Sequence, residues 1–373
     1  MALSRIDTTN MIEDVPQSKL DNNINFRNIV INGGMDLAQR GTSSSGITSD
    51  GIYTVDRIRT GIATAGTWTQ SQSTDVPTAQ GFSNSLKMDC TTANASLSAG
   101  SALLLHHRIE GQNVQYLKYG TSSAESITLS FWVKSNKTGT YIIELDQNGN
   151  GRDYSQSYTI NSADTWEKKT LTFNGDTSAT LANDNTQQLE VNFWLSAGTD
   201  WSSGTLNNAW SSTVNANRAV GQVNLADNTA NEWYITGIQL EAGQTASEFE
   251  FLPVDVNLQR CERYYETLTT GPQQSFGTGL YYTNTKIFSC PRYRTTKRAV
   301  PSLDQVTGTD IYSFFRSSAA DNFNGFDSLS NRTTETTAEL DCGTNMSGTQ
   351  GQAGFLRTGT NATTAFIAFD AEL

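Results

Sequence analysis

The sequence predicts an all-β protein whose main domain is a jelly-roll β-sandwich. Residues 125–173 carry the pattern most clearly, because Ile127, Leu129, Phe131 and Val133 alternate with polar or amphipathic residues. Three more segments of this kind follow, separated by turns rich in Asn and Gly: 141–145, 154–160 and 165–173. Short antiparallel strands at roughly ten-residue spacing are typical of a sandwich or jelly roll.

The overall composition favours the same fold class. Charged residues make up 17% of the chain, and its polarity comes from Ser, Thr, Asn, Gln and Gly, which favour turns and solvated strand faces over helices. The 373 residues are enough for two domains. Mean hydropathy is −0.44, and no apolar run approaches the ~20 residues of a spanning helix, so we expect no membrane insertion.

The net charge argues against a nucleic-acid partner, and the cysteine spacing argues against a metal site. The net charge is −12 and the pI is about 4.7, whereas phosphate contacts need clustered Lys and Arg, so we expect no nucleic-acid partner. We interpret one local basic cluster as a solvated strand edge or a self-assembly contact: Arg292, Arg294, Lys297 and Arg298. The cysteines lack metal-ligand spacing and are expected to be free thiols of a protein assembled in a cytoplasm: Cys90, Cys261, Cys290 and Cys342. The N-terminus has no hydrophobic core of the signal-peptide kind, so a protein acting outside a cell would leave it by another route.

Three regions follow one another along the chain. Residues 1–27 lack apolar periodicity, and we interpret them as an extended arm that orders against a partner. Residues 28–253 form the predicted jelly roll, with a helix or turn over 102–119, a long polar excursion over 197–231, and further strands over 28–32, 67–70, 85–90, 189–195 and 232–241. Residues 254–373 form a smaller β-sandwich, with a short helix from Asp255 and strands within 275–289, 299–306, 311–315 and 365–369.

A set of short motifs is spread over residues 28–373. They are 28–35 (NIVINGGM), 39–42 (QRGT), 53–57 (YTVDR), 108–112 (RIEGQ), 129–135 (LSFWVKS), 158–161 (YTIN), 165–168 (TWEK), 236–243 (TGIQLEAG), 249–251 (FEF), 261–266 (CERYYE) and 365–373 (AFIAFDAEL). In combination they resemble a family of bacteriophage tail-fibre and appended virion proteins. The resemblance implies a first domain similar to jelly-roll carbohydrate-binding modules and a C-terminal β domain that takes part in self-association. The excursion over 197–231 is longer than this pattern contains.

The resemblance also implies a place on a virus particle. We expect the arm to dock the protein onto other virion proteins, with Ile6, Met11, Ile12 and Leu20 as its apolar contacts. A homotrimer is expected from the family. The expected localisation is the virion, assembled in the host cytoplasm and acting outside the cell. Tail fibre, tail hub appendage and capsid decoration all remain open.

Catalysis is not expected, and no cofactor is implied. The only histidines are His106 and His107, and neighbouring strand residues point to opposite faces, so at most one serves a given site. The chain has no Gly-x-Ser-x-Gly elbow and no His-x-x-x-His zinc spacing. A glycosidase needs two carboxylates roughly 5–9 Å apart, and among 37 acidic residues some pair meets that by chance. A polysaccharide depolymerase is the enzymatic alternative.

One loop resembles the first half of a calcium-binding loop. Asp146, Asn148 and Asn150 offer alternate oxygens, and Gly151 permits a sharp turn. The twelfth position is Ser157 and not the closing acid. We therefore interpret the loop as a connection between strands, with these three residues as the candidate calcium ligands of the chain.

Two tryptophans are the leading candidates for ligand contact. Trp132 and Trp194 alternate with the apolar residues of their strands, so they are predicted to point to the polar face opposite the apolar one. Exposed indole rings stack on the apolar faces of sugars, because they combine a large rigid area with one polar group. The alternative is that loops or a neighbouring subunit cover both rings. Trp201 and Trp210, in the polar excursion, are further candidates.

Together these features predict a non-enzymatic phage virion protein. We expect a tail fibre or appendage that attaches to host-surface glycans through an aromatic-bearing jelly roll. Weak sugar contacts in several linked copies gain roughly 10²–10⁴ in avidity. The alternative is a capsid or tail decoration that binds only neighbouring virion proteins.

Overall fold

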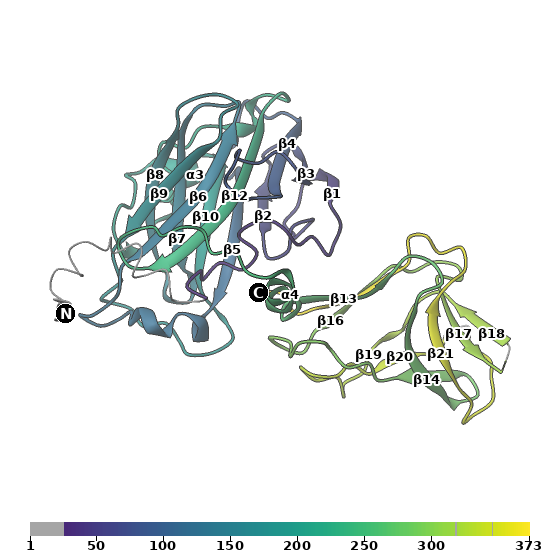
Figure 1. The fold of residues 1–373 in the computed structure, drawn as a ribbon. Coiled ribbons are helices and arrows are strands. Elements are labelled where there is room, and N and C mark those ends of the chain that lie inside the picture. Colours follow the sequence, from purple (N-terminus) through teal and green to yellow (C-terminus); the bar gives the residue numbers. More distant parts are fainter. Residues whose placement is uncertain (1–25, 318, 345) are drawn as a thin grey trace, which may run out of the picture. The chain divides into compact units, whose positions relative to one another are not determined.

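The computed structural model describes residues 26–317, 319–344 and 346–373, which form two compact units (Figure 1). The first unit ends at Leu252 and the second begins at Pro253. The regular secondary structure of both units is mostly antiparallel strands, so the predicted all-β class is confirmed. In the described part of the chain, no helix is long and apolar enough to cross a membrane.

The first unit contains two six-stranded sheets. Sheet A has the order β1-β3-β4-β12-β6-β9, in which the strands are β1 Ser43–Ile47, β3 Thr67–Ser73, β4 Ser85–Thr92, β12 Glu232–Ala242, β6 Ile127–Ser135 and β9 Glu167–Phe173. Sheet B has the order β11-β8-β7-β10-β5-β2, in which the strands are β11 Ser211–Ser212, β8 Arg152–Ile160, β7 Gly139–Gln147, β10 Gln187–Ala197, β5 Ala102–Glu110 and β2 Arg59–Ala63.

Eight of these strands have the order of a jelly roll. In sheet A the neighbours are β4-β12-β6-β9, and in sheet B they are β5-β10-β7-β8. The chain changes sheet at every step from β4 to β12 except between β7 and β8, which form a hairpin, and around the short strand β11. This double Greek-key path defines the jelly roll, so the predicted fold of the first domain is confirmed.

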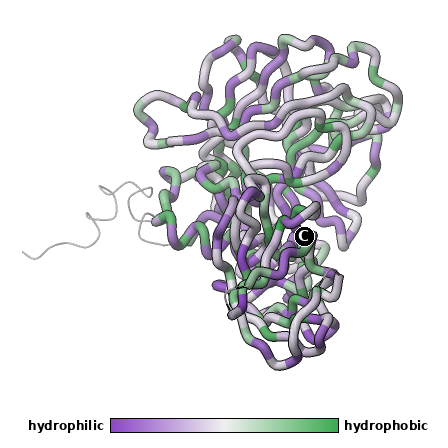
Figure 2. Tube along the Cα trace, turned by 90° about the vertical axis from the view of Figure 1, so that its right-hand side faces the viewer, coloured by the Kyte–Doolittle hydropathy of each residue, from purple (hydrophilic) through white to green (hydrophobic). Residues whose placement is uncertain are grey.

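Strand β6 shows how the sequence builds the core between the sheets. Ile127, Leu129, Phe131 and Val133 are fully buried. The ring of Phe131 lies 5.3 Å from that of Phe193 in β10, centroid to centroid, so the two sheets pack face to face. The alternate residues of β6 point away from the core and define the outer face of sheet A. Figure 2 shows hydrophobic and hydrophilic segments interspersed along the trace.

The second unit begins with helix α4 (Val254–Glu262) and continues in a three-stranded and a seven-stranded sheet. Sheet C has the order β13-β22-β16: β13 Tyr265–Thr270, β22 Phe366–Asp370 and β16 Ser302–Gln305. Sheet D has the order β18-β17-β21-β14-β15-β20-β19: β18 Ala319–Phe323, β17 Tyr312–Arg316, β21 Ala353–Thr358, β14 Ser275–Thr283, β15 Lys286–Ser289, β20 Leu340–Cys342 and β19 Ser328–Leu329. Its core includes the fully buried rings of Tyr281, Tyr312 and Phe314.

One expected element of the first unit is wrong, and another is right only in part. Residues 28–32 form no strand: they run as irregular backbone and a turn, in which Ile29 N donates to Leu240 O at 2.8 Å. Within the expected helix or turn over 102–119, residues 102–110 form strand β5 instead, whereas Gly111–Asn113 and Gln115–Leu117 do form short 3-10 helices. Because β5 is buried on both faces, its apolar residues do not alternate in the way that marks a half-exposed strand.

The polar excursion over 197–231 folds back over the outer face of sheet B. It contains helix α3 (Thr199–Ser202), strand β11 and the 3-10 turns η5 (Asn215–Asn217) and η6 (Leu225–Asp227). Strand β11 pairs with β8 at the edge of sheet B. Three further 3-10 turns lie between strands: η2 Gly111–Asn113, η3 Gln115–Leu117 and η4 Asn148–Asn150. Within the described residues, the four cysteines form no disulfide.

Candidate functional site

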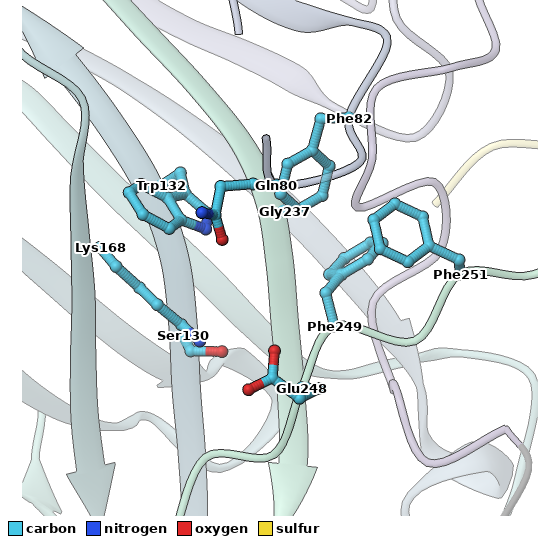
Figure 3. A pocket seen from close by; sticks show the side chains of 9 residues that line it. All are labelled: Gln80, Phe82, Ser130, Trp132, Lys168, Gly237, Glu248, Phe249 and Phe251. Carbon is cyan, nitrogen blue, oxygen red and sulfur yellow. The ribbon is translucent and has the colours of Figure 1, made fainter. Parts of the chain in front are cut away.

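A pocket of about 220 Å³ lies on the outer face of sheet A (Figure 3). Three strands contribute to it: β6 with Ser130 and Trp132, β9 with Lys168, and β12 with Gly237. Two loop segments complete it, one between β3 and β4 and one after β12: Gln80 and Phe82, then Glu248, Phe249 and Phe251. All of these residues belong to the first unit.

Strand pairing places the polar and aromatic groups of the pocket side by side. Trp132 is the cross-strand partner of Lys168 in β9 and of Thr236 in β12. Side chains directly opposite each other in an antiparallel pair have Cβ atoms about 4.5–5.5 Å apart and point to the same face. Ser130 is two residues away on β6 and therefore shares the outer face with Trp132. The outward-facing residues Ser130 and Trp132 of β6 thus form the floor of the pocket.

A bulge in β12 makes room for one wall of the pocket. The register between β12 and β6 shifts between Thr236 and Gln239, and Gly237 adopts φ +65°. A Cβ at Gly237 would lie 2.6 Å from Cζ of Phe82, which is closer than real Cβ atoms come. The glycine therefore both adopts the left-handed backbone and lets the ring of Phe82 lie directly against the strand.

Three phenylalanines form that wall. The ring centroids of Phe82 and Phe249 are 5.0 Å apart, those of Phe82 and Phe251 are 5.2 Å apart, and those of Phe249 and Phe251 are 4.8 Å apart. Figure 3 shows them together on one side of the pocket, with Trp132 on the other. Phe251 is 53% exposed, so the wall is not covered by the rest of the unit. We call these three residues the phenylalanine wall.

The polar side chains around the pocket are not engaged by the protein. Within the described residues, no hydrogen bond or ion pair satisfies the side chains of Gln80, Lys168 and Glu248 or the indole N–H of Trp132. Together they offer an amide, an ammonium, a carboxylate and an indole donor. A small-molecule site has this composition, since a few convergent polar groups beside aromatic surface fix the orientation of a ligand.

The loop that carries Gln80 and Phe82 is held at both ends. The carboxylate of Asp75 accepts hydrogen bonds from Lys134 Nζ and, at 2.9 Å, from Trp166 Nε1. Partial burial tends to raise the pKa of Asp75, but these hydrogen bonds outweigh it and bring the pKa below its usual value. At the other end Thr236 Oγ1 donates to Asn84 O at 2.7 Å. A loop fixed in this way loses less entropy when a ligand binds.

The structure corrects the prediction that Trp194 is an exposed ring. Trp194 is only 2% exposed. The excursion covers it, with Trp201 at 5.8 Å between ring centroids and the Arg218 guanidinium 5.8 Å above the ring. Its Nε1 donates to Glu144 Oε2 at 2.9 Å. The alternative interpretation, cover by a loop, therefore applies to Trp194.

Neither tryptophan of the excursion lines the pocket. Trp201 is half-buried and packs over Trp194. Trp210 is half-buried between the rings of Tyr119 and Tyr154 and donates from Nε1 to Asn174 O at 2.7 Å. Of the four tryptophans predicted to contact ligand, Trp132 alone belongs to the pocket.

The candidate calcium loop is a tight connection between β7 and β8. Asn148–Asn150 form the turn η4, which Gly151 closes with φ 58°. Asp146 Oδ2 lies 3.1 Å from Arg218 Nη2, and Asn150 Nδ2 donates to Gln147 Oε1 at 3.0 Å. Across the described residues, no group of three or more His, Cys, Asp or Glu side chains is arranged to hold a metal ion. These contacts agree with the interpretation of the loop as a strand connection.

The two histidines point to opposite faces of β5, as expected. His106 Nδ1 lies 2.7 Å from Glu190 Oε1 on the outer face of sheet B. His107 Nε2 accepts a hydrogen bond from Ile31 N at 3.3 Å on the inner side. Neither lines the pocket. The proposed docking residues of the arm, Ile6, Met11, Ile12 and Leu20, lie outside the described residues.

Most of the pocket could not be located by sequence reasoning. Lys168 belongs to the predicted strand over 165–173, yet its position opposite Trp132 follows only from the pairing of β6 with β9. Phe249 and Phe251 belong to a short motif, FEF, whose alternate aromatic residues are a usable signal. Gln80, Phe82 and Glu248 lie in loops, where no periodicity predicts which side chains converge.

No protein-family model and no curated protein matches this sequence. Among solved structures, it is similar to the enzymatically active domain of bacteriophage CBA120 tailspike protein 4, with 16% identity and a TM-score of 0.30 over 58% of this chain and 21% of that chain. It is also similar to a putative sugar binding protein from Bacteroides thetaiotaomicron, with 16% identity and a TM-score of 0.30 over 58% of this chain and 99% of that chain. A third similar structure is a CBM4 module, with 13% identity and a TM-score of 0.29 over 57% of this chain and 99% of that chain.

The chain thus spans about a fifth of the length of the tailspike chain that it matches. At TM-scores of 0.29 to 0.30, these similarities carry no argument about ligand or activity. The jelly-roll assignment follows from the strand order of this chain itself.

Proposed function

We propose that the first unit binds glycans through the pocket on the outer face of sheet A. One observation carries this proposal: the ring of Trp132 borders a pocket whose amide, ammonium and carboxylate groups have no partner within the described protein. Sugars present hydroxyl groups that pair with such donors and acceptors, and apolar ring faces that pack on indole. A volume of about 220 Å³ accommodates a single sugar ring.

The proposed activity is binding without cleavage. Glu248 is the single carboxylate among the residues that line the pocket. Hydrolysis of a glycosidic bond by the usual mechanism needs two carboxylates at a defined separation. Incubation of the protein with a polysaccharide that it binds is therefore expected to release no reducing ends. Their release would support the depolymerase alternative.

Replacement of Trp132 tests the binding proposal directly. We expect Trp132→Ala to lower affinity for a glycan, identified on a glycan array, by about tenfold or more, as for a central aromatic contact. Tyr116→Ala is the matched control, because Tyr116 is a 49% exposed aromatic of the same unit outside the pocket. Isothermal titration calorimetry measures both. Equal affinity of wild type and Trp132→Ala would reject the pocket as the binding site.

We further propose that the protein is part of a phage virion, as a tail fibre or appendage present in several copies, with a homotrimer as the expected assembly. The motifs spread over residues 28–373 support this proposal. Several linked pockets would convert weak sugar contacts into firm attachment. Deletion of residues 1–27 is expected to leave a folded oligomer that no longer joins the particle. Light scattering measures the oligomeric state, and the amount of protein incorporated into particles measures docking.

A second candidate is a decoration that binds only neighbouring virion proteins. It is favoured by an apolar outer face of sheet D, where Leu280, Tyr282 and Phe355 are 46%, 62% and 56% exposed. Exposed apolar residues gathered on one face mark partner contacts. Unchanged host adsorption by intact particles carrying Trp132→Ala would favour this candidate over glycan attachment.

A further inference from the structure

The phenylalanine wall gives the pocket a strongly apolar side. Phe82, Phe249 and Phe251 contact one another edge to face or at a tilt, with centroids 4.8 to 5.2 Å apart. Phe251 also lies against a backbone that lacks a side chain, since a Cβ at Gly81 would be 3.1 Å from its Cζ. The wall therefore presents ring surface to the pocket (Figure 3). A sugar whose whole periphery carries hydroxyl groups has nothing apolar to place along such a side.

The side chains of the pocket outside the phenylalanine wall are polar, and their charges add up to zero. Lys168 supplies one positive charge and Glu248 one negative charge, and neither is paired within the described residues. Ser130, 4% exposed, adds a hydroxyl between them at the floor of the pocket. An anionic sugar would be repelled by the carboxylate of Glu248, and a cationic sugar would be repelled by the ammonium of Lys168. An uncharged sugar avoids both repulsions.

We propose that the pocket takes an uncharged sugar that bears a methyl group, as in a 6-deoxyhexose or an N-acetylated hexosamine. The ring hydroxyls of this sugar pair with Lys168, Glu248 and Gln80, while the methyl group lies against the phenylalanine wall. This inference rests on the proposed glycan-binding function and specifies the ligand of the same pocket. The methyl group is the chemistry that both kinds of sugar share.

The preference has two physical sources. Burial of one methyl group against the rings is worth roughly a fourfold gain in affinity. A hydroxymethyl group in the same place would lose the hydration of its hydroxyl without gaining a partner, because the three side chains of the wall offer no acceptor or donor. Both effects favour the methylated sugar, so a ratio of about fourfold is a lower bound.

Matched sugar pairs test this inference on the full-length protein. The first arm compares L-fucose with L-galactose and L-rhamnose with L-mannose, which differ only by methyl against hydroxymethyl. The second arm compares N-acetylglucosamine with glucose and N-acetylgalactosamine with galactose. We expect at least one methylated sugar to bind about fourfold or more tightly than its partner in an NMR titration. The arm in which this occurs identifies the kind of methyl group.

Variants of the phenylalanine wall show whether these rings cause the preference for a sugar with a methyl group. Phe251→Ser changes a 53% exposed residue and is expected to reduce the affinity ratio of the responding sugar pair to about one. Phe82→Ser is the second variant, and Tyr116→Ser is the control outside the pocket, expected to keep the ratio. Equal affinities within every pair, or a ratio that survives both wall variants, would overturn the inference while sugar binding itself stands. Failure of all sugars and of a glycan array would instead reject the proposed function, and this inference with it.

Discussion

Asp146 on β7 lies among acidic side chains that a single arginine offsets. Its Oδ2 is 3.1 Å from Arg218 Nη2, while Glu144 shares its strand face and Asp153 is its cross-strand partner in β8. Burial and repulsion from Glu144 raise the pKa of Asp146 from 3.8 to about 7, with smaller contributions from Glu190 and Asp153. The folded protein therefore retains a proton on Asp146 over a pH range in which the unfolded chain has released it.

We expect Asp146→Asn to stabilise the first unit above pH 7 and to leave it unchanged near pH 3. The wild-type free energy of unfolding falls as the pH rises from about 3.8 to about 7, and the loss is constant above that range. The variant lacks this loss, which is on the order of 4 kcal/mol for a pKa raised from 3.8 to about 7. Urea unfolding at pH 3, 5.5 and 8 measures the difference. A difference between the two proteins that does not change with pH would contradict the prediction.

Lys297 shows a buried ion pair where the sequence predicts a solvated strand edge or a self-assembly contact. Its side chain is fully buried, and Nζ donates to Glu266 Oε2 and to the carbonyl oxygen of Glu262 at the end of α4. Burial lowers the pKa of Lys297, and the hydrogen bond from its ammonium to Glu266 opposes that shift. Arg294, also in the basic cluster, pairs with Glu262 at 2.6 Å. These cations therefore connect elements of the second unit.

Removing one member of this pair is expected to be costly. Lys297→Met leaves the carboxylate of Glu266 buried without its cation, which typically destabilises a protein by about 3–5 kcal/mol. The double variant Lys297→Met with Glu266→Gln removes both charges and is expected to recover a large part of that loss. Chemical denaturation of both variants measures the effect. Equal destabilisation in the single and double variants would show that packing of the lysine stem dominates and not the unpaired charge.

At the scale of elements, the bulge in β12 determines how closely the phenylalanine wall lies against sheet A. Gly237→Ala puts a Cβ 2.6 Å from Cζ of Phe82 and is expected to push the phenylalanine wall into the pocket. Gly151→Ala is the matched control, since Gly151 has a similar φ of +58° and no atom within 4 Å of the added Cβ. Both variants bear a backbone cost of roughly 1 kcal/mol. Only Gly237→Ala is expected to weaken glycan binding, by about fivefold, and equal affinities in titrations of the two variants would contradict this.

The strands that the sequence predicts well are those with one face in the core. In β6, the alternation of Leu129 and Phe131 with Ser130 and Trp132 identifies both the strand and its outward face. In β5 that signal is absent, because Leu103 and Leu105 on the inner side and Ala102 and His106 on the outer side are all buried. A pattern of period two reports exposure on one face, so it fails where both faces are covered.

The same reasoning explains why only part of the candidate site was predicted. Trp132 and Trp194 have equivalent sequence patterns, yet the excursion over 197–231 covers Trp194 and leaves Trp132 at the pocket. Which loop covers which outer face depends on contacts between residues far apart in the chain, such as Arg218 Nε to Glu144 Oε1 at 2.5 Å. Local patterns contain no information about such pairs, and the loop residues Gln80 and Phe82 were missed for the same reason.

At the scale of the whole molecule, the two units have separate hydrophobic cores. Every member of the main core of the first unit lies between Ile29 and Leu240, and every member of the core of the second unit lies between Tyr281 and Phe369. The strands of each sheet likewise come from one unit only. Cooperative unfolding extends over residues that share a core, so each unit is expected to unfold as its own transition.

Differential scanning calorimetry of the full-length protein is therefore expected to show two transitions that respond to different changes. Lys297→Met should lower one of them, and Asp146→Asn at pH 8 should raise the other. A bound sugar at 100 times its dissociation constant stabilises the unit that binds it by about 2.7 kcal/mol, so it should raise the same transition as Asp146→Asn and leave the other in place. A single transition that moves with all three changes would mean that the two cores unfold together.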